Sequence, residues 1–131
     1  MGRIMGLDIG TKRIGIALSD ILHITAQGLT TYSRHDIGQD IKYISELVKK
    51  HAVEKIVCGL PLNMNGTSGS SVDMIKEFCS HLSDIPVEYH DERLSTLVAE
   101  RILIDADVSR QKRKQVIDKM AAVVILQSYL G

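Results

Sequence analysis

Two short apolar segments at the start of the chain set the strongest limit on its fold. Residues 3–9 (RIMGLDI) and 13–19 (RIGIALS) are separated only by Gly10, Thr11 and Lys12. Segments of this length, joined by a short turn that contains glycine, predict a β-hairpin. Residues 24–32 (ITAQGLTTY) are rich in threonine and β-branched residues, so we expect a third strand. The chain is therefore predicted to begin with three consecutive strands.

The rest of the chain alternates between helix and strand patterns. Asp36 is a candidate N-cap for an amphipathic helix that ends near Lys50. The next expected elements are a buried strand at 56–58, a loop at 59–71, a helix with Val72, Ile75, Phe78, Cys79 and Leu82 on one side, a strand from Pro86 to His90, and helices at about 95–105 and 109–130, capped by Ser95 and Ser109. Three successive strands followed by strand–helix alternation predict an α/β fold, with a mixed sheet and helices on its faces.

Length and composition narrow the class of protein. At 131 residues, 44% of them apolar, the chain is predicted to form a single domain, 1–131, with its own core. The 16 Lys and Arg residues balance 16 Asp and Glu residues, which excludes a generally basic surface but not a local basic patch. We found no membrane-length apolar segment and no signal-peptide pattern. The two cysteines, Cys58 and Cys79, are interpreted as core residues, and we expect a cytoplasmic protein.

Three acidic residues stand next to segments that we expect to be buried. Asp8 lies inside an apolar strand, where a carboxylate is costly to bury unless it meets a cation or hydrogen-bond donors. Glu92 follows Asp91 where the last strand stops, and in α/β sheets that position commonly opens onto a site. Asp118 precedes a helical segment that is apolar on nearly every side. Three acids from distant segments are what a magnesium site needs.

Each acid also has an ordinary structural explanation. Asp8 could be only a turn-forming residue, and Glu92 could belong to a solvated strand end with a surface ion pair. Asp118 could be charge on an exposed helix surface. Sequence spacing alone does not establish that the three acids converge.

A group of cations favours a polyanionic partner. Arg110, Lys112, Arg113 and Lys114 lie within five residues, one or two helical turns before Asp118. Arg110, Lys114 and Asp118 share one helical stripe, so the cations would lie beside the proposed metal acid and could hold a phosphate backbone. A solvated run of surface charge is the alternative explanation. Other cations near the acids in sequence are Lys12, Arg13 and Arg93.

The loop after the buried strand is rich in small hydrogen-bond donors. Its residues Asn63, Asn65, Gly66 and Thr67 could contact a phosphate, helped by the N-terminus of the following helix. A plain connection between a strand and a helix fits the same composition. Of the five histidines, only His90, beside the acid pair, has a case for a ligand or acid–base role.

Four segments together resemble one known family. They are LDIGTKRIGIALSD (7–20), GLPLNMNGT (59–67), YHDERLST (89–96) and VIDKMAAVVILQSYL (116–130). In this order they resemble the YqgF/RuvX family, whose members have a ribonuclease-H-like fold related to the RuvC Holliday-junction resolvases. The resemblance spans essentially the whole chain. It implies a five-stranded mixed sheet of order 3-2-1-4-5, flanked by helices on both faces, with Asp8 on the central strand. The family's acids correspond to Asp8, Glu92 and Asp118.

The chain departs from the family and its relatives at two places. Asn65 stands where many family members have Asp, which puts an acidic role for that position in doubt. RuvC-type resolvases carry their second acid after the fourth strand, whereas the GLPLNMNG loop at that place has none, and Glu92 would have to substitute. The fold therefore transfers to this chain more directly than the resolvase mechanism.

The resemblance implies a metal-dependent endonuclease that hydrolyses phosphodiester bonds at the 5′ end of precursor 16S ribosomal RNA during ribosome biogenesis. As a hypothesis, Asp8 bridges two Mg²⁺ or Mn²⁺ ions when substrate is bound, Glu92 and Asp118 each complete one site, and water attacks in line. RNA is favoured over branched DNA as the partner, with ribosomal particles as a further candidate. The protein is expected to act as a monomer or a homodimer and not to bind a membrane.

Three other functions remain as alternatives. One is a Holliday-junction resolvase, which normally cuts two strands symmetrically as a homodimer. Another is a non-catalytic RNA-binding factor for ribosome assembly, which the presence of all three acids disfavours. The third is an ATP-binding sugar-kinase or actin-like domain, because DIGT resembles their phosphate loop. Those proteins enclose a nucleotide between two such domains, and this chain is long enough for only one.

Overall fold

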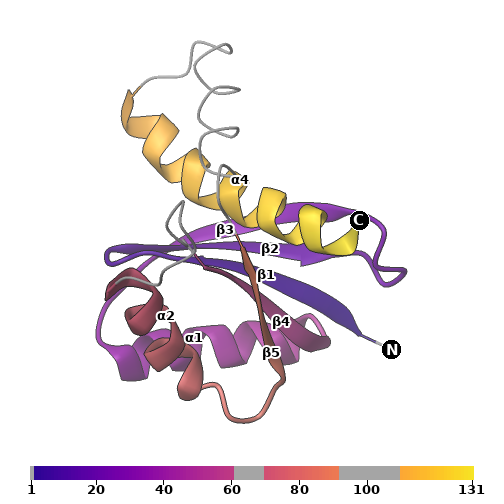
Figure 1. The fold of residues 1–131 in the computed structure, drawn as a ribbon, viewed down its shortest axis with the longest axis horizontal. Coiled ribbons are helices and arrows are strands. Elements are labelled where there is room, and N and C mark those ends of the chain that lie inside the picture. Colours follow the sequence, from indigo (N-terminus) through magenta and orange to yellow (C-terminus); the bar gives the residue numbers. More distant parts are fainter. Residues whose placement is uncertain (1, 61–69, 92–109) are drawn as a thin grey trace.

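A five-stranded mixed sheet forms the centre of the protein, with helices on both of its faces (Figure 1). The computed structural model describes residues 2–60, 70–91 and 110–131. The strand order β3-β2-β1-β4-β5 and the two helical layers confirm the architecture implied by the family resemblance. In chain order the elements are β1 (Arg3–Ile9), β2 (Arg13–Ser19), β3 (Ala26–Ser33), α1 (Ile37–Lys50), β4 (Val53–Leu60), α2 (Ser70–Ser80), β5 (Val87–Asp91) and α4 (Arg110–Leu130).

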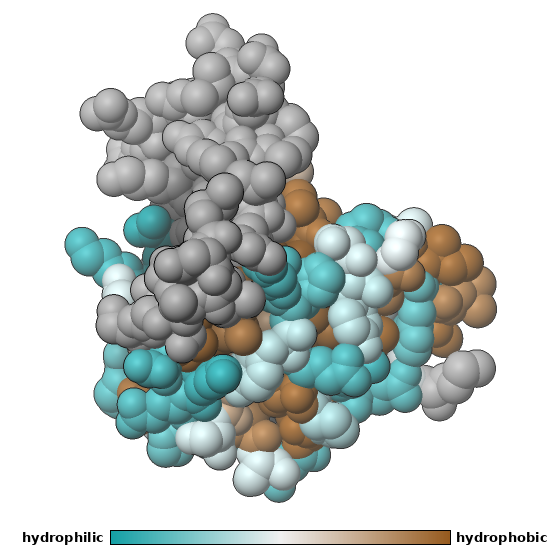
Figure 2. All heavy atoms as spheres, in the orientation of Figure 1, coloured by the Kyte–Doolittle hydropathy of each residue, from teal (hydrophilic) through white to brown (hydrophobic). Residues whose placement is uncertain are grey.

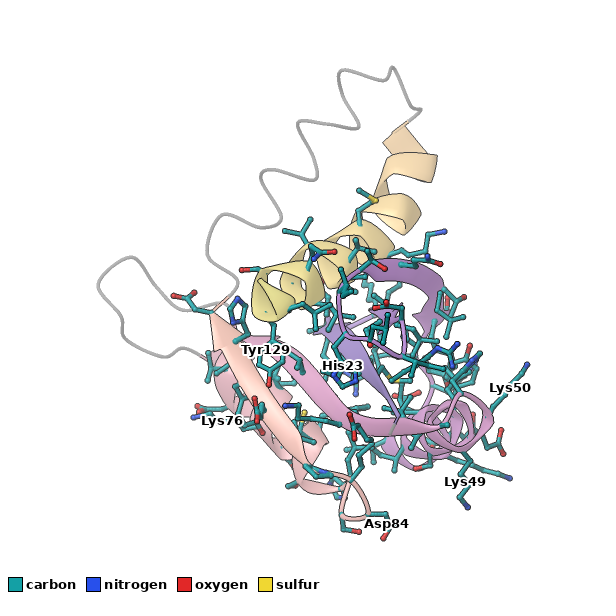
Figure 3. The ribbon with its side chains drawn as sticks, turned by 90° about the vertical axis from the view of Figure 1, so that its right-hand side faces the viewer. His23, Lys49, Lys50, Lys76, Asp84 and Tyr129 are labelled. Carbon is teal, nitrogen blue, oxygen red and sulfur yellow. The ribbon has the colours of Figure 1, made fainter. Side chains whose placement is uncertain are left out.

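The strand directions give the sheet two distinct edges. β1 pairs antiparallel with β2, and β2 antiparallel with β3, whereas β1 pairs parallel with β4 and β4 parallel with β5. The carboxyl ends of β1, β4 and β5 therefore lie together at one edge, which we call the carboxyl edge. The opposite edge carries the β2–β3 loop, the start of β1 and the end of α1; Figure 3 views the molecule from this side.

The N-terminal hairpin is confirmed with the predicted bounds, 3–9 and 13–19. The Gly10 N–H donates to the Arg13 carbonyl over 2.8 Å, which closes the turn between the two strands. A Cβ at position 10 would lie 3.0 Å from that carbonyl oxygen, so the tight turn favours glycine. Two short apolar segments and a turn that contains glycine were sufficient to predict this hairpin.

The third strand begins at Ala26, so the predicted start at residue 24 is wrong. The carboxylate of Asp20 accepts hydrogen bonds from the Ile24 N–H (2.7 Å) and the Thr25 N–H (3.1 Å). These two backbone groups are satisfied inside a closed loop rather than by the neighbouring strand. The loop carries exposed apolar side chains, Ile21, Leu22 and Ile24, in the region that is brown at the right of Figure 2.

The second half of the chain confirms the predicted alternation but changes its bounds. β4 runs from Val53 to Leu60, longer than the predicted 56–58, because Gly59 and Leu60 pair with His90 and Asp91 of β5. The predicted loop 59–71 is therefore too long at both ends, since α2 begins at Ser70. The predicted helix at 95–105 and both serine caps lie outside the described residues.

The first helix follows its predicted cap. Asp36 accepts a hydrogen bond from the Gln39 N–H over 2.8 Å, and α1 begins at Ile37.

β5 begins at Val87 rather than Pro86, because proline has no N–H to donate to the ladder. The Pro86 carbonyl nevertheless accepts from the Ile56 N–H over 2.9 Å.

Two apolar clusters separate the sheet from its helices. The larger cluster packs α1 and α2 against one face, and it contains the five predicted apolar positions of the second helix together with Cys58. Both cysteines are buried and not joined by a disulfide, which confirms their interpretation as core residues. The smaller cluster packs α4 against the other face and consists of Ile4, Ala17, Val57, Ala122, Ile125 and Leu126. Among the described helices, none is both long enough and apolar enough to cross a membrane.

The α4 face depends on close backbone contact at Gly6. A Cβ at position 6 would lie 2.8 Å from the Leu126 Cβ and 3.0 Å from the Ala122 carbonyl oxygen. Real Cβ atoms do not approach so closely, so α4 can lie this near the sheet only because residue 6 has no side chain.

We predict that Gly6→Ala destabilises the protein by about 1–3 kcal/mol, since α4 must shift to admit the methyl group. Urea denaturation gives the free energy of unfolding. The double variant Gly6→Ala/Leu126→Gly should lose less stability than the two single variants added together, because Leu126→Gly removes the Cβ that the new methyl group would meet. Strict additivity of the two substitutions would contradict this explanation.

Candidate functional site

The carboxyl edge of the sheet brings together the strand ends on which candidate residues lie. On β1, Leu7 pairs with Cys58 of β4, so Asp8 lies one residue beyond that pair. On β4, Gly59 pairs with His90 of β5, and Leu60 with Asp91. The ends of the three parallel strands are thus level with one another. β5 ends at this edge with Asp91, and Glu92, the next residue in the sequence, lies outside the described residues.

Asp8 faces α4. Along β1, Met5, Leu7 and Ile9 belong to the larger cluster under α1 and α2, whereas Ile4 belongs to the smaller cluster under α4. Because side chains alternate along a strand, Asp8 lies on the α4 face with Ile4 and Gly6. Its side chain is half-buried, unlike the fully buried residues on either side of it. A carboxylate at this position is supported by the core and still reachable from outside.

The backbone of α4 places position 118 one turn before the contact of this helix with Gly6. The helix passes over Gly6 at Ala122, and Asp118 lies one helical turn before Ala122 on the same stripe. Followed back from Ala122, α4 runs toward the carboxyl edge of the sheet (Figure 1), and position 118 lies in that direction along the helix. The predicted apolar segment after Asp118 packs against the sheet, with Ala121, Ala122, Ile125 and Leu126 buried.

The candidate cations divide between two segments. In the β1–β2 turn, Lys12 is exposed at the carboxyl edge, and Arg13 at the start of β2 is half-buried. The first turns of α4, which extend beyond the sheet, contain Arg110, Lys112, Arg113 and Lys114 (Figure 1). Arg93 lies outside the described residues, as do Asn63, Asn65, Gly66 and Thr67 of the loop that leaves β4 at this same edge.

One residue that the sequence analysis missed holds the turn after Asp8. Arg34, between β3 and α1, donates from Nη1 to the Gly10 carbonyl (2.9 Å) and from its backbone N–H to the Lys12 carbonyl (2.9 Å). Its Nε forms an ion pair with the Asp40 Oδ2 at 3.0 Å, and its guanidinium lies 5.1 Å from the centre of the Phe78 ring. Arg34 therefore connects the turn to α1 through Asp40 and to α2 through Phe78.

Asp40 is the buried partner of this arginine. Its side chain is inaccessible to solvent, and it also accepts from the His35 N–H over 2.8 Å. Burial by itself would raise the pKa of Asp40. Hydrogen bonds from His35, Arg34 and Tyr32, with the charge of Arg34, outweigh that effect and lower the pKa below its ordinary value of 3.8. Asp40 is thus held as a carboxylate.

A second polar network fixes β5 to the last turn of α4. The Tyr129 hydroxyl donates a hydrogen bond to the Glu88 Oε2 and accepts one from the Lys55 Nζ, both over 2.5 Å. Lys55 also forms an ion pair with Glu88 at 3.4 Å. The hydrogen bond from Tyr129 is the main cause that lowers the pKa of Glu88. His90 contacts the Ser128 hydroxyl at 2.9 Å, so its ring is directed to α4. A ligand or acid–base role for His90 stays a prediction.

A cavity of about 350 Å³ lies away from these residues. It is lined by Arg3, Ser19, Asp20, Gly28, Lys50 and neighbouring residues at the opposite edge of the sheet. Within the described side chains, no three of the His, Cys, Asp or Glu residues are grouped closely enough to hold a metal ion. Glu92 and the side chain of Asp118 are not among them, so the predicted three-acid group is neither confirmed nor contradicted.

Sequence comparison places the chain among proteins of similar length. Residues 2–131 match the RuvX family, described as "Holliday junction resolvase". A relative from Clostridioides difficile is 54% identical over 132 residues, covering 98% of this chain and 94% of the relative. A relative from Heliobacterium modesticaldum is 53% identical over 131 residues, covering 98% of this chain and 88% of the relative. Both relatives carry the name "Putative pre-16S rRNA nuclease".

Solved structures confirm the ribonuclease-H-like fold. A fowlpox virus resolvase bound to Holliday-junction DNA superposes with a TM-score of 0.60 at 13% identity, covering 98% of this chain and 96% of the resolvase. Thermus thermophilus RuvC bound to a Holliday junction gives a TM-score of 0.58 at 11% identity, covering 100% of this chain and 97% of RuvC. At such low identity the likeness supports the fold alone.

The ion pair beneath the turn generates a prediction about pH. Because the pKa of Asp40 is lower in the folded protein, its ionised form contributes stability above pH 3.8, and this contribution is lost as the pH falls through the folded value. Asp40→Asn should lower the free energy of unfolding by about 3–5 kcal/mol at pH 7, since it leaves Arg34 buried without its partner.

The difference between wild type and Asp40→Asn should then shrink below about pH 4. Urea denaturation of both proteins at a series of pH values measures it. A difference that stays constant down to pH 3 would show that the Asp40 carboxylate is not held ionised by its partners.

Proposed function

The chain belongs to the RuvX family, and from this premise we propose that it is a metal-dependent endonuclease that cleaves precursor 16S ribosomal RNA near its 5′ end. The observation that carries the proposal is the half-buried Asp8 at the carboxyl edge, on the face covered by α4. β5 ends at the same edge immediately before Glu92, and α4 has Asp118 one turn before its contact with Gly6. The three family acids therefore belong to segments that lead to one region.

Carboxylates from three separate segments fit a hard divalent cation such as Mg²⁺ or Mn²⁺, which prefers oxygen ligands. We assign the ligand role to Asp8, Glu92 and Asp118, with Asp8 shared between two ions when substrate is bound. The half-buried setting of Asp8 fits this role, because a ligand must be held by the fold and still accessible. When bound, the ions would offset the negative charge that develops on the phosphodiester.

The protein's cations would hold the nucleic acid backbone on either side of the acids. Lys12 is exposed in the turn that follows Asp8, and Arg110 and Lys114 share the helical stripe of Asp118. We assign phosphate contacts to these residues, to Arg13, Arg93, Lys112 and Arg113, and to the loop residues Asn63, Asn65, Gly66 and Thr67. Such contacts position a substrate without selecting its sequence.

Two observations bear on the choice of substrate. Relatives that share about half of their residues with this chain, over nearly its whole length, are named for precursor 16S rRNA, which favours RNA. The family description and the similar solved structures favour four-way DNA junctions as the alternative substrate. We place RNA first because the relatives are far closer to this chain in sequence than the resolvases of known structure.

The central test is cleavage of three substrates in Mg²⁺ or Mn²⁺: a precursor 16S rRNA fragment, an unstructured RNA and a four-way DNA junction. We expect metal-dependent cleavage of the precursor, reduced at least about 100-fold in Asp8→Asn, because one lost ligand removes several kcal/mol of transition-state stabilisation. Asp84→Asn, which removes an exposed carboxylate from the α2–β5 connection (Figure 3), is the matched control and should cleave normally.

Symmetric cutting of the junction with no cutting of RNA would assign the resolvase function instead. RNA binding without cleavage by wild type would assign an assembly role. Metal binding is followed separately through the melting temperature, which Mn²⁺ should raise in wild type and Asp84→Asn but not in Asp8→Asn. An equal rise in all three proteins would contradict Asp8 as a ligand.

We also predict that Lys114→Gln weakens RNA binding and makes it less sensitive to salt. Removing one phosphate contact to a single strand should reduce the slope of log K against log salt by about 0.7. Lys49→Gln removes the same charge from the end of α1 at the opposite edge (Figure 3), and its slope should equal that of wild type. Fluorescence anisotropy at several salt concentrations measures both, and identical slopes for the two variants would contradict the assignment.

A further inference from the structure

Arg34 holds two carbonyl groups of the β1–β2 turn. The Gly10 carbonyl, two residues beyond Asp8, accepts from the Arg34 Nη1 over 2.9 Å. The Lys12 carbonyl accepts from the Arg34 backbone N–H over the same distance. One residue therefore fixes the turn on the side of the proposed metal ligand and on the side of the proposed phosphate contact.

The arginine is itself fixed from three directions. Its Nε pairs with Asp40 of α1, its Nη1 lies 3.9 Å from the Met74 Sδ of α2, and its guanidinium stacks over Phe78 of the same helix. The Arg34 side chain is only 15% exposed, and that of Asp40 is not exposed at all. The turn is thus tied to the most buried part of the larger apolar cluster.

Stability alone does not explain this arrangement. A buried ion pair seldom stabilises a protein more than apolar residues of similar volume, because both charges must be removed from water. The pair instead fixes the direction in which the guanidinium donates its hydrogen bonds. The rigid fork of the guanidinium directs Nε to Asp40 and Nη1 to Gly10 at once, which the single ammonium group of a lysine cannot reproduce.

We propose that Arg34 is a positioning residue that, clamped by Asp40, fixes the β1–β2 turn and thereby sets the orientation of Asp8 for metal binding. This inference rests on the proposed function in one respect, the role of Asp8 as a ligand. Groups that do not touch the metal but fix the orientation of its ligands contribute strongly to metal affinity. Their loss commonly weakens metal binding or activity by 10- to 100-fold. Arg34 does not touch the substrate and acts only through the turn.

The test compares the full-length wild type with Arg34→Lys, which keeps the charge and removes the fork. Amide hydrogen exchange of Gly10 and Arg13 reports the rigidity of the turn directly, and it should become at least about tenfold faster in the variant. The Mn²⁺ dissociation constant, from calorimetry, should rise by about 10- to 100-fold. In the cleavage assay at saturating RNA, kcat should fall at limiting Mn²⁺ and recover as Mn²⁺ is increased.

Asp20→Asn is the matched control for loss of stability alone. The Asp20 carboxylate also accepts two backbone N–H groups, but it lies in the β2–β3 loop at the opposite edge of the sheet. It should lower the melting temperature while leaving the Mn²⁺ dissociation constant and the exchange of Gly10 unchanged. If Arg34→Lys does not fold, Asp40→Asn, which releases the clamp without altering Arg34, should show the same changes in exchange and Mn²⁺ affinity.

Wild-type exchange at Gly10, or wild-type Mn²⁺ affinity, in a folded clamp variant would overturn the inference. Equal weakening of Mn²⁺ binding by Asp20→Asn would overturn it as well, because the effect would then follow from stability. Failure of the proposed function has a different signature. Wild type would bind Mn²⁺ through Asp8 and cleave no RNA, while the exchange and affinity comparisons would still decide the role of Arg34.

Discussion

The parallel pairing of β1 with β4 and of β4 with β5 is the constraint on which the rest of the structure depends. Parallel strands end at the same edge, so residues that are far apart in sequence but follow these strands are brought to one place. The antiparallel hairpin then returns the chain from that edge through a turn of only three residues, which leaves Asp8 near the open end of the central strand. α1 and α2 pack on one face of this sheet and α4 on the other.

The two faces are packed differently, and the difference matters at the site. The lower face has large side chains such as Phe78 and Ile44, which fill the space under two helices. The α4 face has small residues where helix and sheet are closest, namely Gly6, Ala17 and Ala122. Small residues let the helix backbone approach the sheet at Gly6. Larger residues there would have to move α4 away from β1.

Local sequence patterns predicted the elements well, and the prediction failed where a loop closure, a strand pairing or a long-range side-chain contact decided the structure. The hairpin follows from two apolar segments and a short turn, and the cap at Asp36 from one side chain acting on its neighbours. The start of β3 was missed because the Asp20 carboxylate closes the preceding loop. The predicted strand at 56–58 was too short at its end because the last residues of β4 pair with β5. Arg34 gave no signal at all. Its partner on the turn, Gly10, is 24 residues away, and an arginine between a strand and a helix resembles ordinary surface charge. Of the three predicted acids, the described side chains include only Asp8.

A site assembled from three segments needs each segment fixed separately, and apolar packing alone does not do this. Hydrophobic contacts set the distance between layers but are non-directional, so they leave a turn or a strand end free to adjust. Directional, charge-assisted hydrogen bonds provide the missing restraint. Beneath the sheet, the Asp40–Arg34 pair fixes the turn after Asp8; above it, Tyr129 with Lys55 and Glu88 fixes the strand that leads to Glu92. The Arg34–Asp40 and Lys55–Glu88 ion pairs therefore lie where direction, more than stability, is required.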